Sequence, residues 1–149
     1  MANHLRRQVR EAVATLLTGL TTTGSRVYQS RVQPLAASQL PGLVILTNNE
    51  DIEQSTIGGM LERRLQVEVI GKVKASADVD DKLDDIAKEV EVKVYSSLTN
   101  NTLTGLIKSL DLKSIDVGIN GETDQKVGEI RMQFEAVYFN QAATPDVSA

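Results

Sequence analysis

Residues 63–94, RRLQVEVIGKVKASADVDDKLDDIAKEVEVKV, decide the fold because their hydrophobic pattern changes its period halfway along. The first half alternates, with apolar side chains at Leu65, Val67, Val69 and Val73. In the second half the spacing is helical, with apolar side chains at Val79, Leu83, Ile86, Ala87, Val90 and Val94, and then at Leu98. A period of two is typical of a strand with one wet face, and a period near 3.6 of an amphipathic helix. A strand followed directly by a helix is therefore predicted, and Ile70 and Gly71, which interrupt the alternation, suggest a bulge or an interface patch.

An acidic cluster lies where the two halves meet, at Asp78, Asp80, Asp81, Asp84 and Asp85. A calcium-binding loop would need a glycine and a glutamate where the chain has Leu83 and Glu89. Carboxylates at the start of a helix compensate its exposed backbone N–H groups and its dipole. We therefore interpret the cluster as the N-cap and first turn of the helix rather than as a metal site.

The same reasoning applied to the rest of the chain predicts a helix over residues 5–20 and strands over 26–33, 43–47, 113–119 and 127–139. A short helical turn is expected around 103–110. The order α-β-β-β-α-β-β predicts an α+β fold, in which a largely antiparallel, mixed sheet of about five strands carries two main helices on one face. Residues 1–140 are expected to form a single domain and residues 141–149 a flexible tail.

Composition and charge narrow the classes of function. The 149 residues are 41% hydrophobic but only 3% aromatic, so the core must be aliphatic. The net charge is −4, so the chain lacks the excess of basic residues that is typical of nucleic-acid binding. The absence of cysteine excludes disulfides, thiol catalysis and thiolate metal sites. The sequence has neither a secretory signal nor an apolar run of about 18 residues, so we expect a soluble protein that does not enter a membrane.

Catalytic motifs are scarce. His4 is the only histidine, it lies beside the N-terminus, and neither of the two common glycine-rich phosphate loops occurs. A catalytic pair of carboxylates is not excluded, because two acids from distant parts of a sequence can meet in space. We therefore expect a protein that is not an enzyme and has no cofactor; a small soluble binding or adaptor domain and a hydrolase are the alternatives.

Residues 48–61, NNEDIEQSTIGGML, show no clear period and are interpreted as a loop. Loops of this length inside a compact domain tend to be functional. Three apolar residues, Ile52, Ile57 and Met60, would be exposed in it. The loop is therefore expected to be buried against another chain, with folding back onto its own domain as the alternative.

Several segments, taken in order, resemble a known family: LRRQVREAVATLLTGL, LPGLVILTNNEDIE, RRLQVEVIGKVKA, DVDDKLDDIAKEVEVKV and VGEIRMQFEAVYF. Over residues 5–139 they are similar to the tail terminator, or tail completion, proteins of bacteriophages with long non-contractile tails, the lambda-type minor tail protein U family. The most characteristic parts are the strand entry LPGLVILT and the passage at 64–94.

The resemblance implies a structural protein of the virion, found at the head-proximal end of the tail after assembly in the host cytoplasm. Such proteins form a homohexameric ring that caps the major tail tube protein at a length set by the tape measure protein. The ring then presents a surface to the head-completion or connector protein. No catalysis or cofactor is implied, and DNA would pass through the ring without specific binding, since phosphate binding depends on Lys and Arg.

Ring closure requires a head-to-tail contact between different surfaces of neighbouring copies. We expect arginines on one side of this contact to pair with acids of the 48–61 segment, including Glu53, on the other side. The interface hypothesis covers Arg6, Arg10, Glu50, Asp51, Ile52, Ile57, Met60, Arg63 and Arg64.

Overall fold

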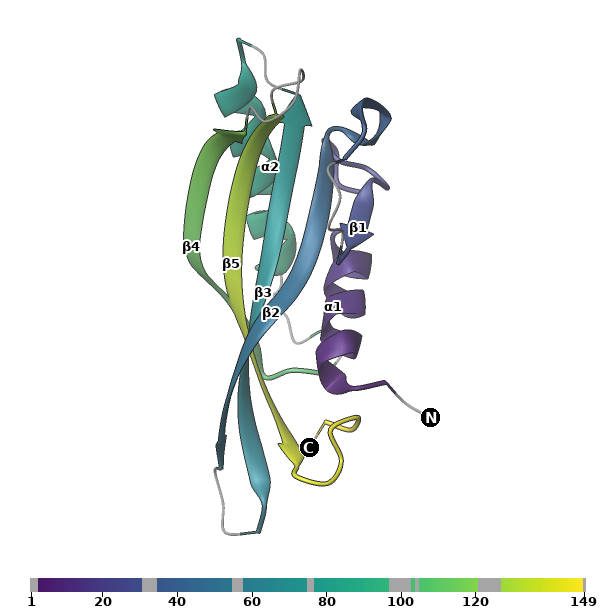
Figure 1. Ribbon diagram of the computed structural model, residues 1–149, viewed down its shortest axis with the longest axis vertical. Coiled ribbons are helices and arrows are strands. Elements are labelled where there is room, and N and C mark those ends of the chain that lie inside the picture. Colours follow the sequence, from purple (N-terminus) through teal and green to yellow (C-terminus); the bar gives the residue numbers. More distant parts are fainter. Residues whose placement is uncertain are drawn as a thin grey trace.

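The structure, a computed structural model, describes residues 3–30, 35–54, 58–74, 77–96, 103, 105–120 and 127–148. Its elements are α1 (Leu5–Leu16), β1 (Val27–Gln29), the short 3-10 helix η1 (Ala37–Gln39), β2 (Gly42–Gln54), β3 (Met60–Lys74), α2 (Val79–Val94), β4 (Ser109–Asn120) and β5 (Val127–Gln141). Long strands dominate the molecule, and the ends of β2 and β3 extend beyond α1 (Figure 1).

The strands form one sheet in the order β1-β2-β3-β5-β4. Strand β1 runs parallel to β2, and every other neighbouring pair is antiparallel. The predicted α+β fold with a largely antiparallel, mixed sheet is therefore confirmed. The predicted order of elements is confirmed as well.

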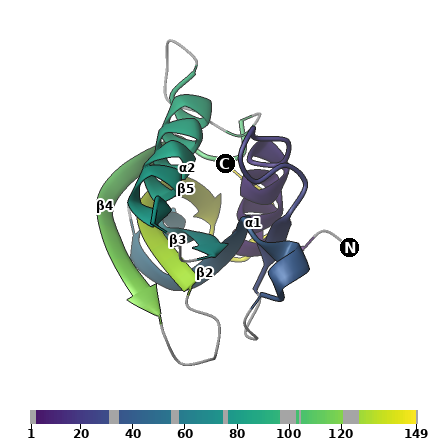
Figure 2. The ribbon, with the colours of Figure 1, turned by 90° about the horizontal axis from the view of Figure 1, so that it is seen from above.

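Both helices cover the same concave face of the sheet (Figure 2). One apolar cluster joins α1, α2 and this inner face, and it includes Val9, Leu83, Val69 and Met132, none of which is more than 1% exposed. Burial of aliphatic side chains between the two layers is the main source of stability for such a fold. The position of the two helices follows from this shared core.

Gly71 is a point of close packing between α2 and the sheet. Strand β3 pairs with β5 without a register shift from Met60 to Lys74, so the suggested bulge is wrong. A Cβ atom on Gly71 would lie 2.8 Å from Cγ2 of Ile86 and 2.9 Å from Cγ2 of Ile130. A glycine is needed here because a larger residue would push α2 away from the strand. Ile70 faces the other side, where it is buried with Leu35 and Val44.

The acidic cluster lies at the junction between β3 and α2, as predicted. Asp78 is the N-cap residue, and Asp80 and Asp81 are in the first turn. The side chain of Asp78 makes no capping hydrogen bond, and its carboxylate lies 3.9 Å from the ammonium of Lys82. These carboxylates therefore act on the helix start through charge rather than through a side-chain cap.

The interpretation of residues 48–61 as a loop is wrong. Strand β2 continues to Gln54 and β3 begins at Met60, so most of the segment forms a β-hairpin; residues 55–57 lie outside the described part. The register shifts between Thr47 and Asn49, which makes Asn48 a bulge. A bulge moves the side-chain alternation by one residue, and this hid the period of the strand.

Smaller differences occur at other element ends. Helix α1 ends at Leu16 rather than at residue 20, and Gly19 follows with a φ of 95° that favours glycine. Strand β1 ends at Gln29, and residues 31–33 of the predicted strand lie outside the described part. No helix occurs in the described part of 103–110; Leu103 begins a turn, and β4 starts at Ser109.

The residues after β5 run along the N-terminus of α1. The backbone N–H of Leu5 donates to the carbonyl of Pro145 at 2.7 Å, and Gln8 Nε2 donates to the carbonyl of Asp146 at 2.9 Å. The N–H of Ala142 donates to the carbonyl of Gly59, at the start of β3, at 2.9 Å. The C-terminal segment therefore connects α1 to the tip of the β2–β3 hairpin.

Candidate assembly interface

The β2–β3 hairpin projects from the body of the domain. We define the arm as residues 48–54 of β2 and 60–66 of β3. In its β2 half every residue except Glu50 is exposed, whereas Gly42–Ile45 at the start of the same strand are buried. The β2 half of the arm is therefore wet on both faces, whereas Arg63 and Leu65 in its β3 half are buried.

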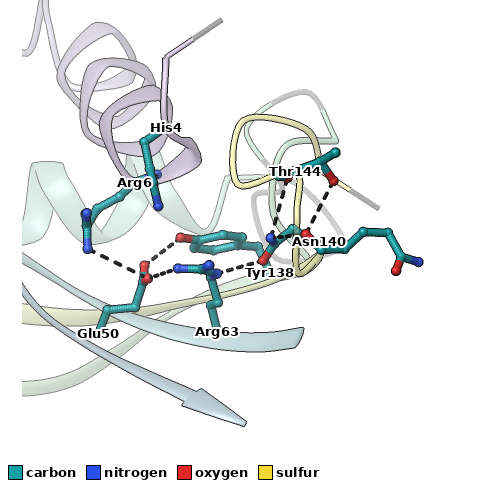
Figure 3. A network of polar contacts seen from close by, with 8 residues as sticks. His4, Arg6, Glu50, Arg63, Tyr138, Asn140 and Thr144 are labelled. Carbon is teal, nitrogen blue, oxygen red and sulfur yellow. Dashed lines mark hydrogen bonds and ion pairs between the residues drawn. The ribbon is translucent and has the colours of Figure 1, made fainter. Parts of the chain in front are cut away.

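A buried polar cluster supports the base of the arm (Figure 3). The carboxylate of Glu50 accepts a hydrogen bond from Arg63 Nη1 at 2.6 Å and another from the Tyr138 hydroxyl at 2.5 Å. The side chains of Glu50 and Arg63 are only 4% and 9% exposed. The two carboxylate oxygens thus bring together β2, β3 and β5, which supply the three side chains.

Further contacts extend this cluster. Arg63 Nε donates to Oδ1 of Asn140 at 2.7 Å, and Asn140 Nδ2 donates to the carbonyl of Gln141 at 2.7 Å. Arg6 Nη1, from α1, lies 3.9 Å from the carboxylate of Glu50. Because a buried charge is costly unless it is paired and hydrogen-bonded, these contacts are what allow Glu50 and Arg63 to be buried.

The partners of Glu50 correct one part of the interface hypothesis. We expected Arg6 and Arg63 to meet acids such as Glu50 across a seam between subunits. Instead, both arginines contact Glu50 of the same chain, and the Glu50 and Arg63 side chains are almost fully covered. Sequence spacing could not show this, because the pair forms only when the hairpin folds.

His4 has a structural role beside the cluster. It is the N-cap residue of α1, and its Nδ1 accepts a hydrogen bond from the Arg6 backbone N–H at 3.0 Å. Burial, and then the positive charges of Arg6 and Arg63, lower the pKa of His4. The imidazole is therefore neutral near pH 7, which it must be to accept the capping hydrogen bond.

The pKa of Tyr138 is raised by its environment, whereas that of His4 is lowered. Burial, and then the hydrogen bond to the Glu50 carboxylate, raise the pKa of the Tyr138 hydroxyl. The phenol thus keeps its proton and acts as a donor. The arrangement is that of a structural contact, in which the Tyr138 hydroxyl stays protonated.

The other residues of the interface hypothesis are more exposed. Ile52 is 52% exposed, and the side chain of Arg64 is 49% exposed and pairs with Glu62 and Glu135. Asp51 is exposed and Met60 is half-buried. Arg10, half-buried, donates to the hydroxyl of Thr47 at 3.0 Å, and Ile57 lies outside the described residues. Their role in assembly stays a prediction.

A second polar group holds the bulge at Asn48 from the outer face of the sheet. Asn48 Nδ2 donates to Glu68 Oε2 at 3.1 Å, and Arg131 Nη1 donates to Glu68 Oε1 at 2.8 Å. Glu68 is a buried residue, and hydrogen bonds from both neighbouring strands satisfy its carboxylate. The bulge is therefore fixed at the level where β2 leaves the body.

Two kinds of site residue were missed by the sequence reasoning. The pairing of Tyr138 with Glu50 could not be named from the sequence, and Asn140 was not part of the interface hypothesis. Ile115 and Val117, which alternate with polar or small residues along β4, are 40% and 57% exposed. The only sequence signal for Asn140 was a polar residue that continues the inward alternation of Ala136 and Tyr138.

Within the described ranges, no three His, Asp or Glu side chains converge in a way that could hold a metal ion. In the same part of the chain, no helix combines the length and the apolar character that crossing a membrane requires.

The fold and the arm define an α+β domain with a projecting hairpin. The chain belongs to the phage minor tail protein U family, whose model matches residues 4–138. A solved structure described as the virion of a native gene transfer agent (GTA) particle contains a similar chain, with 16% identity, a TM-score of 0.52 and 92% of each chain covered. At this identity the likeness shows a shared fold. No curated protein matches the chain. The resemblance seen in the sequence is thus confirmed, and the chain is a structural protein of the phage tail.

Proposed function

We propose that this protein caps the phage tail tube as a homohexameric ring at the head-proximal end of the tail. The match to the minor tail protein U family over residues 4–138 carries the proposal. The ring binds the last turn of the major tail tube protein, ends its growth at the length set by the tape measure protein, and offers a surface to the head connector. Its role is structural rather than catalytic, and assembly takes place in the host cytoplasm.

The arm supports this proposal as an assembly surface. It exposes Ile52 at 52%, in a β-hairpin whose base is fixed by buried ionic contacts. An exposed apolar side chain on a rigid support is suited to burial against a second protein. The acidic balance of the chain, with a net charge of −4, supports passage of DNA through the ring without binding.

Loss of the protein should leave tails that are too long and carry no heads. The test is negative-stain electron microscopy of particles from phage with a stop codon early in the gene, with and without the wild-type chain supplied in the host. Tails of normal length joined to heads in the absence of the protein would refute the capping function.

The arm is tested by a separate variant that carries Ile52→Asp and Met60→Asp. It should fold, because both positions lie on the arm rather than in the core, but it should fail to restore tail length and head joining. Val92→Asp is a matched control, since Val92 of α2 is 60% exposed. Full restoration by the arm variant would show that the arm is not the assembly surface.

A further inference from the structure

The two outer edges of the sheet each have a segment with no strand beside it in the described part of the chain. On one edge, β1 pairs only with Leu43, Val44 and Ile45 of β2, so β2 is unpaired on that side along the arm. On the other edge, β4 pairs with β5 on one side only. Unpaired backbone N–H and C=O groups on an edge strand are a template for pairing with another chain.

The free part of β4 begins at a bulge. The Leu112 backbone N–H donates to the hydroxyl of Tyr95, the C-cap residue of α2, at 2.6 Å, so the C-terminal end of α2 covers the edge there. The register then shifts between Leu112 and Ser114, and residues 113–118 are all exposed. The cover over β4 thus ends at the level of the sheet at which β2 enters the arm, since Leu112 and Thr47 flank the central pair Val67 and Phe134. From this level the free part of β4 and the arm extend in opposite directions along the strands.

The exposed apolar side chains of the two edges lie on one face. Ile115 and Val117 are opposite Met132 and Ile130 of the inner face, and directly opposite residues share a face. Ile52 lies two residues after Glu50, which is opposite the core residue Leu65. All three belong to the helix-bearing face, where each is between 40% and 57% exposed.

We propose that β4 of one copy pairs with the arm segment of β2 in the next copy, so that the sheet continues from subunit to subunit. The inference rests on the proposed ring. Strands β2 and β4 run in opposite directions within one chain, because three antiparallel pairs separate them. In a closed ring the sheet continues around the axis as in a barrel, and so the contact between copies is antiparallel. Because the free part of β4 and the arm extend in opposite directions along the strands, the strands must be inclined to the ring axis. The contact joins two different surfaces, as a closed ring requires.

Side-chain chemistry selects the register that places Ile52 opposite Ile115. Both are large exposed apolar residues, and cross-strand pairs of this kind stabilise a sheet. Lys113, which forms no ion pair within the described part of the chain, then lies opposite Gln54. Asp116 faces Asp51 in this register, and this like-charge pair weakens the contact.

Cysteine cross-linking tests the contact, because the natural chain contains no cysteine. Tails are purified from phage that carry Ile52→Cys together with Ile115→Cys and are treated with a short bis-maleimide. A denaturing gel should show a ladder of multiples of 16.2 kDa, at least tenfold stronger than with Ile52→Cys together with Val92→Cys. Either single variant should give only the monomer band.

Rings at the tail end without a ladder would overturn the edge pairing but leave the ring intact. A dimer from Ile52→Cys alone would also overturn it, because it would indicate a two-fold contact between identical surfaces. Particles without any ring would contradict the proposed function itself.

A gain of association gives a second, independent test. Asp116→Lys removes the repulsion with Asp51 and should lower the protein concentration needed for association by several-fold, as measured by sedimentation velocity. Asp81→Lys on the exposed face of α2 makes the same charge change away from the edge and should not alter it. Weaker association of the Asp116→Lys variant would count against the pairing.

Discussion

Strands β2, β3 and β5 pass through two regions that are stabilised in different ways. Next to the helices, their inner face is aliphatic and packs under α1 and α2, with Leu43, Val69 and Met132 almost fully buried. Around the base of the arm, the same strands are joined by Glu50, Arg63 and Tyr138. A single sheet thus changes from hydrophobic to polar stabilisation along its length.

The comparison shows how a small domain can hold a hairpin away from its core. Hydrophobic packing needs a covering layer, and the helices cover only part of the strands (Figure 1). Hydrogen bonds and ion pairs are directional, so they can set the direction of an uncovered hairpin. Their stability depends strongly on each partner, whereas an aliphatic core spreads its stability over many contacts.

Breaking the polar region should have the largest effect. Glu50→Gln leaves the buried charge of Arg63 without its carboxylate and should reduce the free energy of unfolding by about 3 kcal/mol. Urea unfolding followed by circular dichroism measures the change. Arg64→Gln, which removes a half-exposed partner of Glu62 and Glu135, is the control and should change it by less than about 1 kcal/mol. Equal effects of the two variants would show that burial of Glu50 does not matter.

Overpacking the helix-covered region should have the next largest effect. A Cβ atom on Gly128 would lie 2.3 Å from Cγ2 of Val79, the first residue of α2. Gly128→Ala should therefore destabilise the protein by about 2 kcal/mol. Gly118→Ala on β4 is the control, because its Cβ would meet nothing within 4 Å. Thermal unfolding of both variants decides the matter, and equal melting temperatures would contradict close packing of α2.

Removing one hydrogen bond from the polar region should have a smaller effect. Tyr138→Phe removes the donor to Glu50 and should cost about 1–2 kcal/mol near pH 7. The raised pKa of Tyr138 means that the phenol contributes fully below the unfolded value near 10 and loses this contribution at higher pH. The gap in stability between wild type and variant should therefore narrow above pH 10 in urea titrations. A gap that widens there would refute the shift.

The smallest expected effect concerns His4. Because its pKa is lowered on folding, the unfolded chain binds the proton more readily, and His4 lowers stability as the pH falls through about 6.5. His4→Asn keeps a capping side chain but does not titrate. Between pH 7 and pH 5 the wild type should lose slightly more stability than this variant, as measured by urea midpoints. An equal loss of stability in both proteins would show that the pH dependence comes from groups other than His4.

The strand-to-helix passage at 63–94 was predictable because its patterns are local. Alternation over Leu65–Val69 and helical spacing from Val79 each depend on a few neighbouring residues. The arm was missed for an equally physical reason: the bulge at Asn48 shifts the alternation, so 48–54 looks aperiodic. The buried pair of Glu50 and Arg63 lies beyond sequence reasoning, since nothing local distinguishes these residues from the exposed Asp51 and Arg64.

The sequence by itself determined the order of elements, the aliphatic core, the acidic start of α2 and the resemblance to a tail protein family. The first three follow from short-range periodicity and composition, whereas the resemblance rests on the order and pattern of whole segments along the chain. Only the tertiary structure decided which acid is buried, which edges of the sheet are free and which face carries Ile52, Ile115 and Val117. These depend on strand register, which brings together residues from distant parts of the chain and is fixed by packing of the whole sheet.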